Sequence, residues 1–393
     1  MESARRNVFL LACCQALLFT NNVTLISLNG LAGFQLASNK ALATLPVTGY
    51  VVGAAASTFF ASLWMKRVGR RNGFLTGTLF GIAGGAITTY AIWIGSFWTL
   101  VFGTLVLGTY NAFGQYYRFA AADASPGPWK AKAISLVMAG GLVGGIIGPE
   151  MSKHTRDLAQ PTFVASYASL IGFCLVTMAI LSMLRIPAPK QEEVHGETRP
   201  LAEIMAQPVF IVAVLVSALG YGVMNLLMTS TPLAMGFCGL PYAAAASVIS
   251  AHVVAMFGPS FFTGSLIQRF GVLNVMMAGV VLMFACVGIA LSGQQFTQFW
   301  LALALLGVGW NFMYVGGTTL LTEAYRPAEK AKAQGANEIL VFCTVASSSF
   351  ASGVLVNASG WNTLNYVALP FLAIAGLAAL WLAVKRRAAP AAA

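Results

Sequence analysis

The sequence predicts an all-α integral membrane protein with twelve transmembrane helices in two pseudo-symmetric six-helix bundles. The first observation is composition: 58% of the 393 residues are hydrophobic, 8% are charged, and the mean hydropathy is +0.78. A soluble domain has about 45–50% apolar and about 25% charged residues, so this composition excludes that class. The second observation is a series of long apolar runs, and the third is a polar cluster that occurs twice.

The apolar runs have the length of membrane-spanning helices. A helix needs about 20 predominantly apolar residues to cross the hydrocarbon core. Only helices or closed barrels satisfy the backbone in lipid, and these runs are too continuous for barrel strands, which alternate over about ten residues. The twelve runs are 8–35, 42–64, 72–95, 97–122, 133–151, 162–184, 208–230, 241–263, 272–292, 297–321, 336–357 and 363–384.

The polar cluster at 110–133 recurs at an offset of 200 residues, which indicates two related halves. The longest polar interval falls after the sixth run and contains prolines and glutamates. We therefore predict an N-terminal bundle at 1–184, a cytoplasmic linker at 185–207 and a C-terminal bundle at 208–393. The matched residues are Asn111 with Asn311, Asp123 with Glu323, and Lys130–Ala133 with Lys330–Ala333.

Lysine and arginine fall mainly in loops that share one side of the membrane. With a cytoplasmic N-terminus, all but four of the 22 basic residues lie on the cytoplasmic side. Cytoplasmic loops carry such an excess, so we expect both termini inside, at the cytoplasmic (inner) membrane of a bacterium. The bias accounts for the formal charge of +11 without a nucleic-acid partner. The exceptions are Lys40, Lys153 and Arg156 in outer loops and Arg118 within a run.

Side chains typical of metal or catalytic sites form no motif in the sequence. None of the six cysteines has a CxxC spacing, and five of them lie inside apolar runs, which favours packing over a metal or a disulfide. No nucleotide-binding Walker sequence and no catalytic constellation is present. We therefore expect a protein that is not an enzyme and that holds no cofactor or metal.

Twelve helices in two halves resemble the major facilitator superfamily of secondary transporters. The loop at 62–71 reads SLWMKRVGRR and is similar to the family's Gly-x-Leu-x-Asp-Arg-x-Gly-Arg-Arg signature. Its counterpart at 264–271 reads GSLIQRFG, and both copies keep Arg-x-Gly but lack the acid. The fifth run has a glycine-rich stretch that resembles a motif of the family's proton antiporters, which implies the drug:proton antiporter-like branch with twelve helices. Its residues include Gly144, Gly148 and Pro149.

The resemblance also implies a gate on the cytoplasmic side. It places the signature loop near Asp123 and near Glu338 at the inner end of the eleventh run. We expect Asp123 to form an ion pair that holds the loop, and Glu338 to pair with a loop base across the two halves. The alternative is that these charges only set topology, because surface pairs contribute about 0–1 kcal/mol. The predicted gate residues are Lys66, Arg67, Gly69, Arg70, Asp123, Arg269 and Glu338.

Polar and aromatic residues inside four of the runs are the candidates for solute contact. Such residues are costly in lipid unless they face a cavity or a partner. The first, fourth, seventh and tenth helices line the central cavity in this family, and the candidates lie on these four. The alternative is that each side chain only bonds a neighbouring helix, at around 0.6 kcal/mol. The candidates are Asn22, Asn111, Gln115, Arg118, Tyr221, Asn225, Trp310, Asn311 and Tyr314.

Two ionisable residues within the runs have open roles. Arg118 is five residues from Asp123, near the inner end of its run. One interpretation is that it contacts the solute or the gate, and the alternative is that its long side chain reaches the inner surface. His252 lies near the midplane of the eighth run, and histidine changes charge in the physiological range. We predict that His252 couples transport to protons, and the alternative is a neutral histidine bonded within the bundle.

These features predict a secondary active transporter that works by alternating access. The first expectation is proton-coupled export (antiport, efflux) of a small organic solute, which rests on the glycine-rich fifth helix. Uptake of an anionic nutrient or metabolite is the alternative, favoured if Arg118 faces the cavity. A membrane receptor that does not transport is disfavoured, because the polar stripes would then serve no purpose. We expect a monomer whose partners are the solute, protons and membrane lipid.

Overall fold

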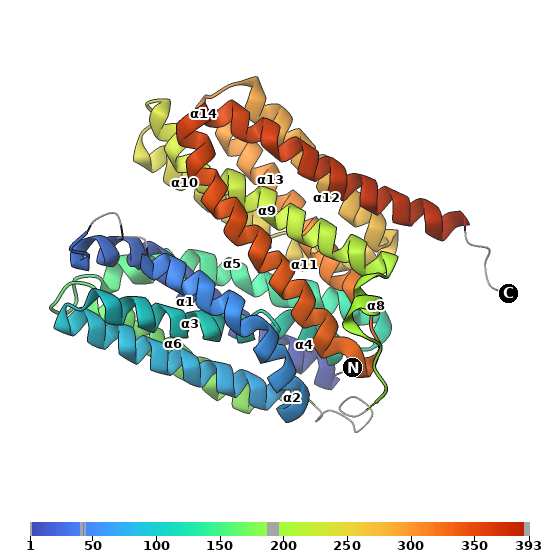
Figure 1. Cartoon of the computed structure of the whole chain (residues 1–393), viewed down its shortest axis with the longest axis horizontal. Helices are drawn as coiled ribbons and strands as arrows, with labels where there is room; N and C mark the ends of the chain where they lie inside the picture. The colour runs from blue at the N-terminus through green and yellow to red at the C-terminus, as the bar shows by residue number, and fades with distance from the viewer. Residues whose placement is uncertain (1, 40–41, 43–44, 187–195, 389–393) are drawn as a thin grey trace. The chain divides into compact units, whose positions relative to one another are not determined.

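The computed structural model describes residues 2–39, 42, 45–186 and 196–388. Helices make up most of these residues, and no strand occurs among them. They divide into two compact units, which we describe separately (Figure 1). Lys40, the start of the predicted run 42–64 and residues 187–195 of the predicted linker lie outside the described residues.

Unit 1 contains Met1–Pro126, Leu136–Glu197 and Gln334–Glu338. Within it, α2 packs along α3, and α6 packs against both α1 and α2. Buried apolar side chains such as Leu28, Leu107 and Tyr167 form a core between these helices. Its helices are α1 (Glu2–Leu36), α2 (Leu45–Ile94), α3 (Phe97–Gly114), α4 (Tyr117–Asp123), most of α5 (Lys130–Thr155) and α6 (Val164–Ser182).

Unit 2 contains Gly127–Ser135, Thr198–Ala333 and Ile339–Ala393. The helix α13 lies at its centre and packs against α9, α10 and α12. Its elements are η2 (Gly127–Trp129), the start of α5, α8 (Leu201–Met205), α9 (Pro208–Phe237), α10 (Tyr242–Phe257), α11 (Ser260–Phe270), α12 (Val272–Ser292), α13 (Phe296–Leu321), η3 (Pro327–Glu329) and most of α14 (Lys330–Ala388).

The predicted apolar runs all fall in helices, but helices and runs do not correspond one to one. The long helices α2 and α14 each hold two runs, and their backbones leave the helical conformation at Gly69 and Gly360. Two other runs are broken: 97–122 continues from α3 into α4, and 241–263 continues from α10 into α11 across a bend of 41°. By length and apolarity, eight described helices can cross a membrane, or nine if α10 and α11 form one span. The number of candidate spans is below the predicted twelve partly because α2, which holds two apolar runs, is counted as one span.

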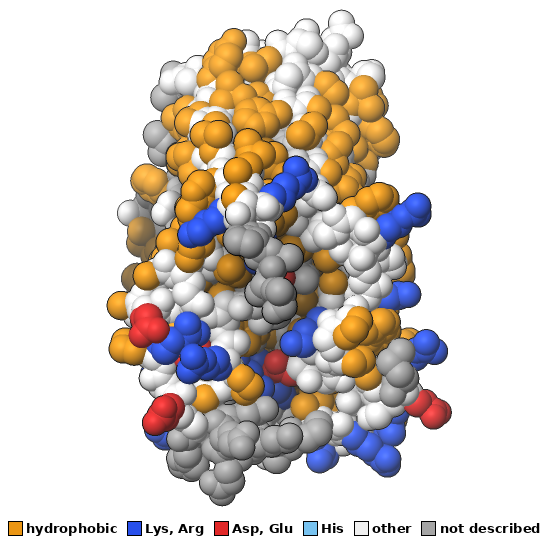
Figure 2. Space-filling view, turned by 90° about the vertical axis from the view of Figure 1, so that its right-hand side faces the viewer, with side chains coloured by type: hydrophobic (Ala, Val, Ile, Leu, Met, Phe, Trp, Pro, Cys, Tyr) orange, Lys and Arg blue, Asp and Glu red, His pale blue; other side chains and the backbone are white. Residues whose placement is uncertain are grey.

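The outer surfaces of the helices fit a lipid environment. Large apolar side chains stand exposed on helices of both units, for example Phe9, Trp98, Phe261 and Leu377. Figure 2 shows one face on which lysine and arginine side chains are frequent and acidic side chains are few. An all-α membrane fold of about twelve helices is therefore the observed class.

Candidate functional site

A chain of hydrogen-bonded polar side chains crosses unit 1. The Tyr50 hydroxyl on α2 donates to Asn22 Oδ1 on α1. Asn22 Nδ2 in turn donates to Asn111 Oδ1 on α3 over 3.0 Å. Gln115 Nε2 donates to the same oxygen over 3.1 Å. Because Asn22 and Asn111 are buried and Gln115 is half-buried, Gln115 is the most accessible amide of this group. The structure thus brings together three of the predicted solute contacts, which we call the amide group (Asn22, Asn111, Gln115).

Arg118 extends this chain to an ion pair. Its Nη1 donates to the backbone oxygen of Gln115 over 3.1 Å and to Gln115 Oε1 over 3.2 Å. Its Nη2 lies 2.5 Å from Glu338 Oε1, and the two side chains are only 2% and 1% exposed. Asn337 Nδ2 donates to the same carboxylate oxygen over 2.8 Å. The guanidinium is therefore buried and paired, and it does not reach the surface.

Glu338 has a different partner from the one that the sequence predicts. We expected Lys66, Arg67 or Arg70 to pair with it, whereas Arg118 holds it. The reason is that Arg70 is already bound one helical turn earlier on α14: its Nη2 donates to Gln334 Oε1 over 2.5 Å. The expected partner for Glu338 was therefore wrong.

The predicted contact between the signature loop and Asp123 is present and is made by Arg70. Its Nη2 lies 2.9 Å from Asp123 Oδ2, and its guanidinium stands over the Tyr116 ring at 5.7 Å. Arg70 is buried, whereas Arg67 and its counterpart Arg269 are exposed. Whether these residues act in gating stays a prediction.

Unit 2 carries an aromatic cluster formed by Tyr221, Trp310 and Tyr314. The rings of Trp310 and Tyr314 are stacked, with centroids 5.0 Å apart and planes at 18°. Tyr221 from α9 meets both rings edge-on, at 5.3 Å and 5.2 Å. Trp310 is 1% exposed and its indole Nε1 has no hydrogen-bond acceptor among the described residues, whereas Tyr221 is half-buried. Three predicted contacts are thus brought together, and they include a buried donor without an acceptor.

Two further candidates on unit 2 are bonded to neighbouring helices. Asn225 Nδ2 donates to Ser348 Oγ on α14 over 3.0 Å. Asn311 is 0% exposed and donates to the Met256 carbonyl over 2.6 Å and to Ser260 Oγ over 2.5 Å. It also accepts from Thr263 Oγ1 over 2.7 Å. Asn311 therefore ties α13 to the bend between α10 and α11, which supports the helix-bonding alternative, and a role in solute contact stays a prediction.

His252 is enclosed between α10 and α13. It is 0% exposed, and its Nδ1 lies 2.7 Å from the carbonyl oxygen of Leu303. A carbonyl only accepts, so Nδ1 carries the proton in this contact. Nε2 has no hydrogen-bond partner in the part of the chain that the structure describes. This environment supports the bonded-histidine alternative, and a role in proton coupling stays a prediction.

The glycines of α5 form a close crossing with α1. A Cβ atom at Gly144 would lie 2.5 Å from the Ala16 carbonyl oxygen, and one at Gly148 would lie 2.7 Å from Val23 Cβ. The Thr24 hydroxyl donates to the Gly148 carbonyl over 3.1 Å, beside Pro149. Small residues let two helices approach in this way, so packing accounts for the motif.

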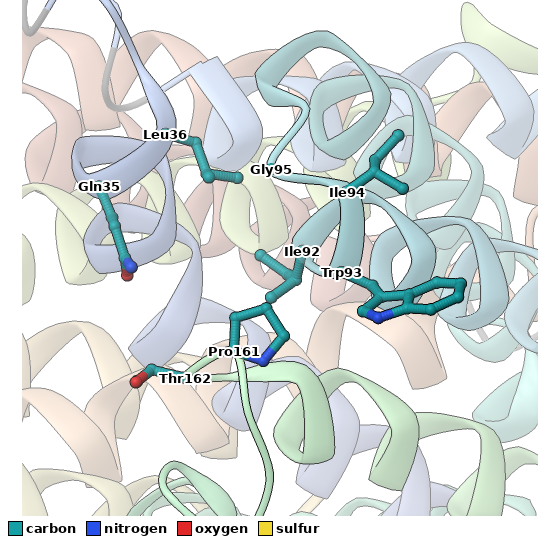
Figure 3. Close-up of a pocket in the computed structure, with 8 residues that line it drawn as sticks. All are labelled: Gln35, Leu36, Ile92, Trp93, Ile94, Gly95, Pro161 and Thr162. Atoms are coloured by element: carbon teal, nitrogen blue, oxygen red, sulfur yellow. The ribbon is translucent and has the colours of Figure 1, made fainter.

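A cavity of about 320 Å³ lies in unit 1, and Figure 3 shows residues that line it. It is lined by the C-terminal ends of α1 and α2 and by residues 161–162. Ile92, Trp93 and Pro161 supply apolar surface, and none of the predicted site residues lines it. The cavity is separate from the amide group.

Sequence reasoning missed several residues of these groups. Tyr50 stands alone among apolar residues, so no pattern marks it. By contrast, the missed residues Gln334 and Asn337 have i and i+3 spacing and share a helix face with the predicted Glu338 at i+4, which was a usable signal.

Comparison with known proteins identifies the family. The family model of the Major Facilitator Superfamily matches residues 8–261 and 238–393. A riboflavin transporter, RfnT, of Brucella anthropi is 43% identical over 95% of this chain and 94% of its own length. The uncharacterized MFS-type transporter YdeG of Bacillus subtilis is 28% identical over 87% and 84% of the two chains. The MFS transporter FucP, crystallised in the outward conformation, has a TM-score of 0.79 at 16% identity over 95% of this chain and 98% of its own, a likeness in fold alone. The chain therefore belongs to the major facilitator superfamily of membrane transporters.

Proposed function

We propose that this transporter moves riboflavin, or a solute with the same flavin ring system, into the cell by alternating access. The relative of 43% identity over nearly the whole chain is a riboflavin transporter, which supports this solute class. The observation that carries the proposal is the aromatic cluster of Tyr221, Trp310 and Tyr314. A flavin presents a large planar aromatic ring, and such rings stack favourably on tryptophan and tyrosine.

The unpaired indole donor of Trp310 supports the same solute. A buried N–H without an acceptor costs about 1–3 kcal/mol, and this cost disappears when an acceptor arrives. The flavin ring carries carbonyl oxygens at its edge, which accept hydrogen bonds. Trp310 Nε1 is such a donor. A flavin edge bound to it would be fixed in orientation as well as stacked.

The charges near the amide group in unit 1 are compensated, which favours a solute without net charge. The alternative of an anionic nutrient requires that the Arg118 guanidinium is available to a carboxylate or phosphate of the solute. Glu338 compensates this charge at 2.5 Å, and the amide group adjoining the pair is uncharged. Riboflavin is uncharged at neutral pH and offers hydroxyl, imide and carbonyl groups to amides. The amide group therefore supports a flavin better than an organic anion.

Uptake replaces export as the first proposal. The expectation of export rested on the glycine-rich fifth helix, and the crossing of α1 and α5 explains these glycines without it. Our proposal includes a bacterial cytoplasmic membrane and a monomer, and the distribution of basic residues supports termini that both lie inside. Coupling to protons is part of this proposal, since uptake against a gradient requires a driving ion.

The test is solute binding followed by flux. Purified protein is titrated with riboflavin, with an aromatic organic anion and with a lipophilic cation, and quenching of flavin fluorescence or a shift in melting temperature reports binding. Proteoliposomes then measure riboflavin entry with and without an inward proton gradient. We expect saturable riboflavin binding and entry stimulated by the gradient. Binding of only the anion or only the cation, with riboflavin at the level of empty liposomes, would overturn the proposal, and movement outward with inward protons would identify an exporter.

A further inference from the structure

The helices α12 and α14 of unit 2 run antiparallel and enclose a cavity at one end. Trp361 Nε1 on α14 donates to the Ala290 carbonyl near the end of α12 over 3.2 Å. Further along α14, a Cβ atom at Gly376 would lie 3.1 Å from Val280 Cγ1 in the middle of α12. The last turns of α14 therefore meet the first turn of α12, and a cavity of about 210 Å³ lies between them. It is lined by residues 271–274, Ala383, Arg386 and Arg387.

This cavity is basic, and one of its two arginines lacks a counter-charge. Arg386 Nη2 lies 2.6 Å from Glu323 Oε2, so its charge is compensated. Arg387 is exposed and forms no ion pair with any residue that the structure describes. The described residues that line the cavity include no acidic side chain, since residues 271–274 are Gly, Val, Leu and Asn. A guanidinium binds a phosphate group through two parallel hydrogen bonds, so the cavity suits a ligand that carries phosphate.

An apolar strip, formed by Leu380 and Val384, leads from Arg387 along the outer face of α14. The three residues have i, i+4 and i+7 spacing, which places them on one face of the helix. Leu380 is 49% exposed and Val384 is 57% exposed, and the neighbouring Trp381 is 50% exposed. Because Ser359–Ala388 is long and apolar enough to cross a membrane, these side chains fit a lipid-facing surface, with the tryptophan near the headgroups. A ligand that fits both the cavity and the strip carries a phosphate group and a hydrocarbon chain.

We propose that this cavity binds the headgroup of an anionic phospholipid, with the phosphodiester on Arg387 and an acyl chain along the apolar strip. Three basic residues, Lys385, Arg386 and Arg387, follow one another in the last turn of α14. Such a cluster attracts a headgroup with net negative charge and disfavours one that carries its own ammonium group. The bound lipid holds the end of α14 against the start of α12. Free phosphate shares the chemistry of the headgroup but leaves the apolar strip without a ligand.

The test compares Arg387→Gln with Lys385→Gln. Lys385 is the matched control, because it has the same charge in the same helical turn, but its Nζ lies 5.1 Å from the Trp381 ring and it does not line the cavity. The purified full chain in detergent is titrated with phosphatidylglycerol and with phosphatidylcholine of the same acyl chains, and native mass spectrometry counts the bound lipid. We expect the wild type and K385Q to prefer phosphatidylglycerol. In R387Q the affinity for phosphatidylglycerol should fall about fivefold, the value of one basic residue at an anionic lipid surface. Equal affinities of the wild type and R387Q for phosphatidylglycerol would overturn the inference.

A second measurement separates the lipid from free phosphate. The melting temperature of the wild type is recorded with inorganic phosphate alone, with phosphatidylglycerol alone and with both together. We expect phosphatidylglycerol to raise it, and excess inorganic phosphate neither to raise it nor to remove the effect of the lipid. A rise with phosphate that is lost in R387Q, together with no effect of the lipid, would assign the cavity to a soluble phosphate and overturn the lipid. The comparison of ligands on the wild type also decides the matter if R387Q does not fold. None of these measurements uses riboflavin, so their outcome is independent of the proposed solute.

Discussion

Gly69 and Gly271 adopt the same unusual backbone conformation, with φ and ψ of 83° and 164° at Gly69 and of 86° and 151° at Gly271. Both end the Arg-x-Gly core of the repeated loop, 202 residues apart. A residue with a side chain rarely adopts this region, and forcing it there costs about 1–3 kcal/mol. The glycine of the motif therefore serves the sharp turn between successive helices, in both copies.

A matched pair of glycine substitutions tests this role. A Cβ atom at Gly271 or at Gly288 meets nothing within 4 Å, so the two positions differ in backbone conformation and not in crowding. We expect Gly271→Ala to lower the free energy of unfolding by about 1–3 kcal/mol. Gly288→Ala, inside α12, should leave it unchanged or raise it by up to about 1 kcal/mol. Unfolding curves in mild detergent provide the measurement, and equal stabilities of the two variants would contradict the strain argument.

Removing only the indole donor of Trp310 tests its contact with solute. Trp310→Phe keeps an aromatic ring in the stack but loses Nε1–H, so riboflavin affinity should fall by about 0.5–1.5 kcal/mol, the net value of one hydrogen bond. Trp300→Phe is the control on the same helix, because Trp300 is 40% exposed and is not among the rings of the cluster. Titration of flavin fluorescence gives both affinities. An unchanged affinity in W310F would show that the indole donor does not meet the solute.

The helices of this protein could be predicted from its sequence, whereas the contacts within the candidate site could not. Apolar run length is a property of many residues, so the helices were accessible to sequence reasoning, whereas the division into two bundles at the predicted bounds stays a prediction. The partner of Glu338 depends on which of several arginines a single rotamer reaches, and no periodicity encodes that choice. Asn111 and Asn311 show the same limit. They match in the repeat, yet one bonds Asn22 and the other bonds the bend between α10 and α11, which among the described residues is the one broken span of its kind.

Glu329 and Glu203 both pair with Arg199, but we expect them to contribute very different amounts to stability. Glu329 accepts from Arg199 Nη2 over 2.6 Å and from two backbone N–H groups, and these contacts lower the pKa of Glu329 to about 2. Glu203 lies 3.9 Å from Arg199 and is 59% exposed. Because the folded pKa of Glu329 lies below the unfolded value, its contribution to stability is complete above about pH 4.5 and is lost as the pH falls toward about 2.

Replacing each glutamate by glutamine tests this linkage. Glu329→Gln should lower the free energy of unfolding at pH 7 by about 1–3 kcal/mol and should flatten its decrease between about pH 4.5 and pH 2. Glu203→Gln, which removes an exposed pair with the same arginine, should change it by less than about 0.5 kcal/mol. Unfolding at a series of pH values measures both. A wild-type acid dependence in E329Q would place the effect on another carboxyl group.

The pair Asn111 and Asn311 separates solute contact from helix bonding. Asn311 makes three hydrogen bonds in a site without solvent access, so Asn311→Leu should lower the free energy of unfolding by about 1–3 kcal/mol because its partners are left unsatisfied. Asn111→Leu also breaks buried bonds, to Asn22 and to Gln115, but it lies in the amide group. We therefore expect it to weaken riboflavin binding at least as much as it weakens folding. The measurements are the stability and the flavin affinity of both variants. If both residues only bond helices, the affinity per folded molecule stays unchanged in both. If Asn111 contacts the solute, the affinity falls in N111L only.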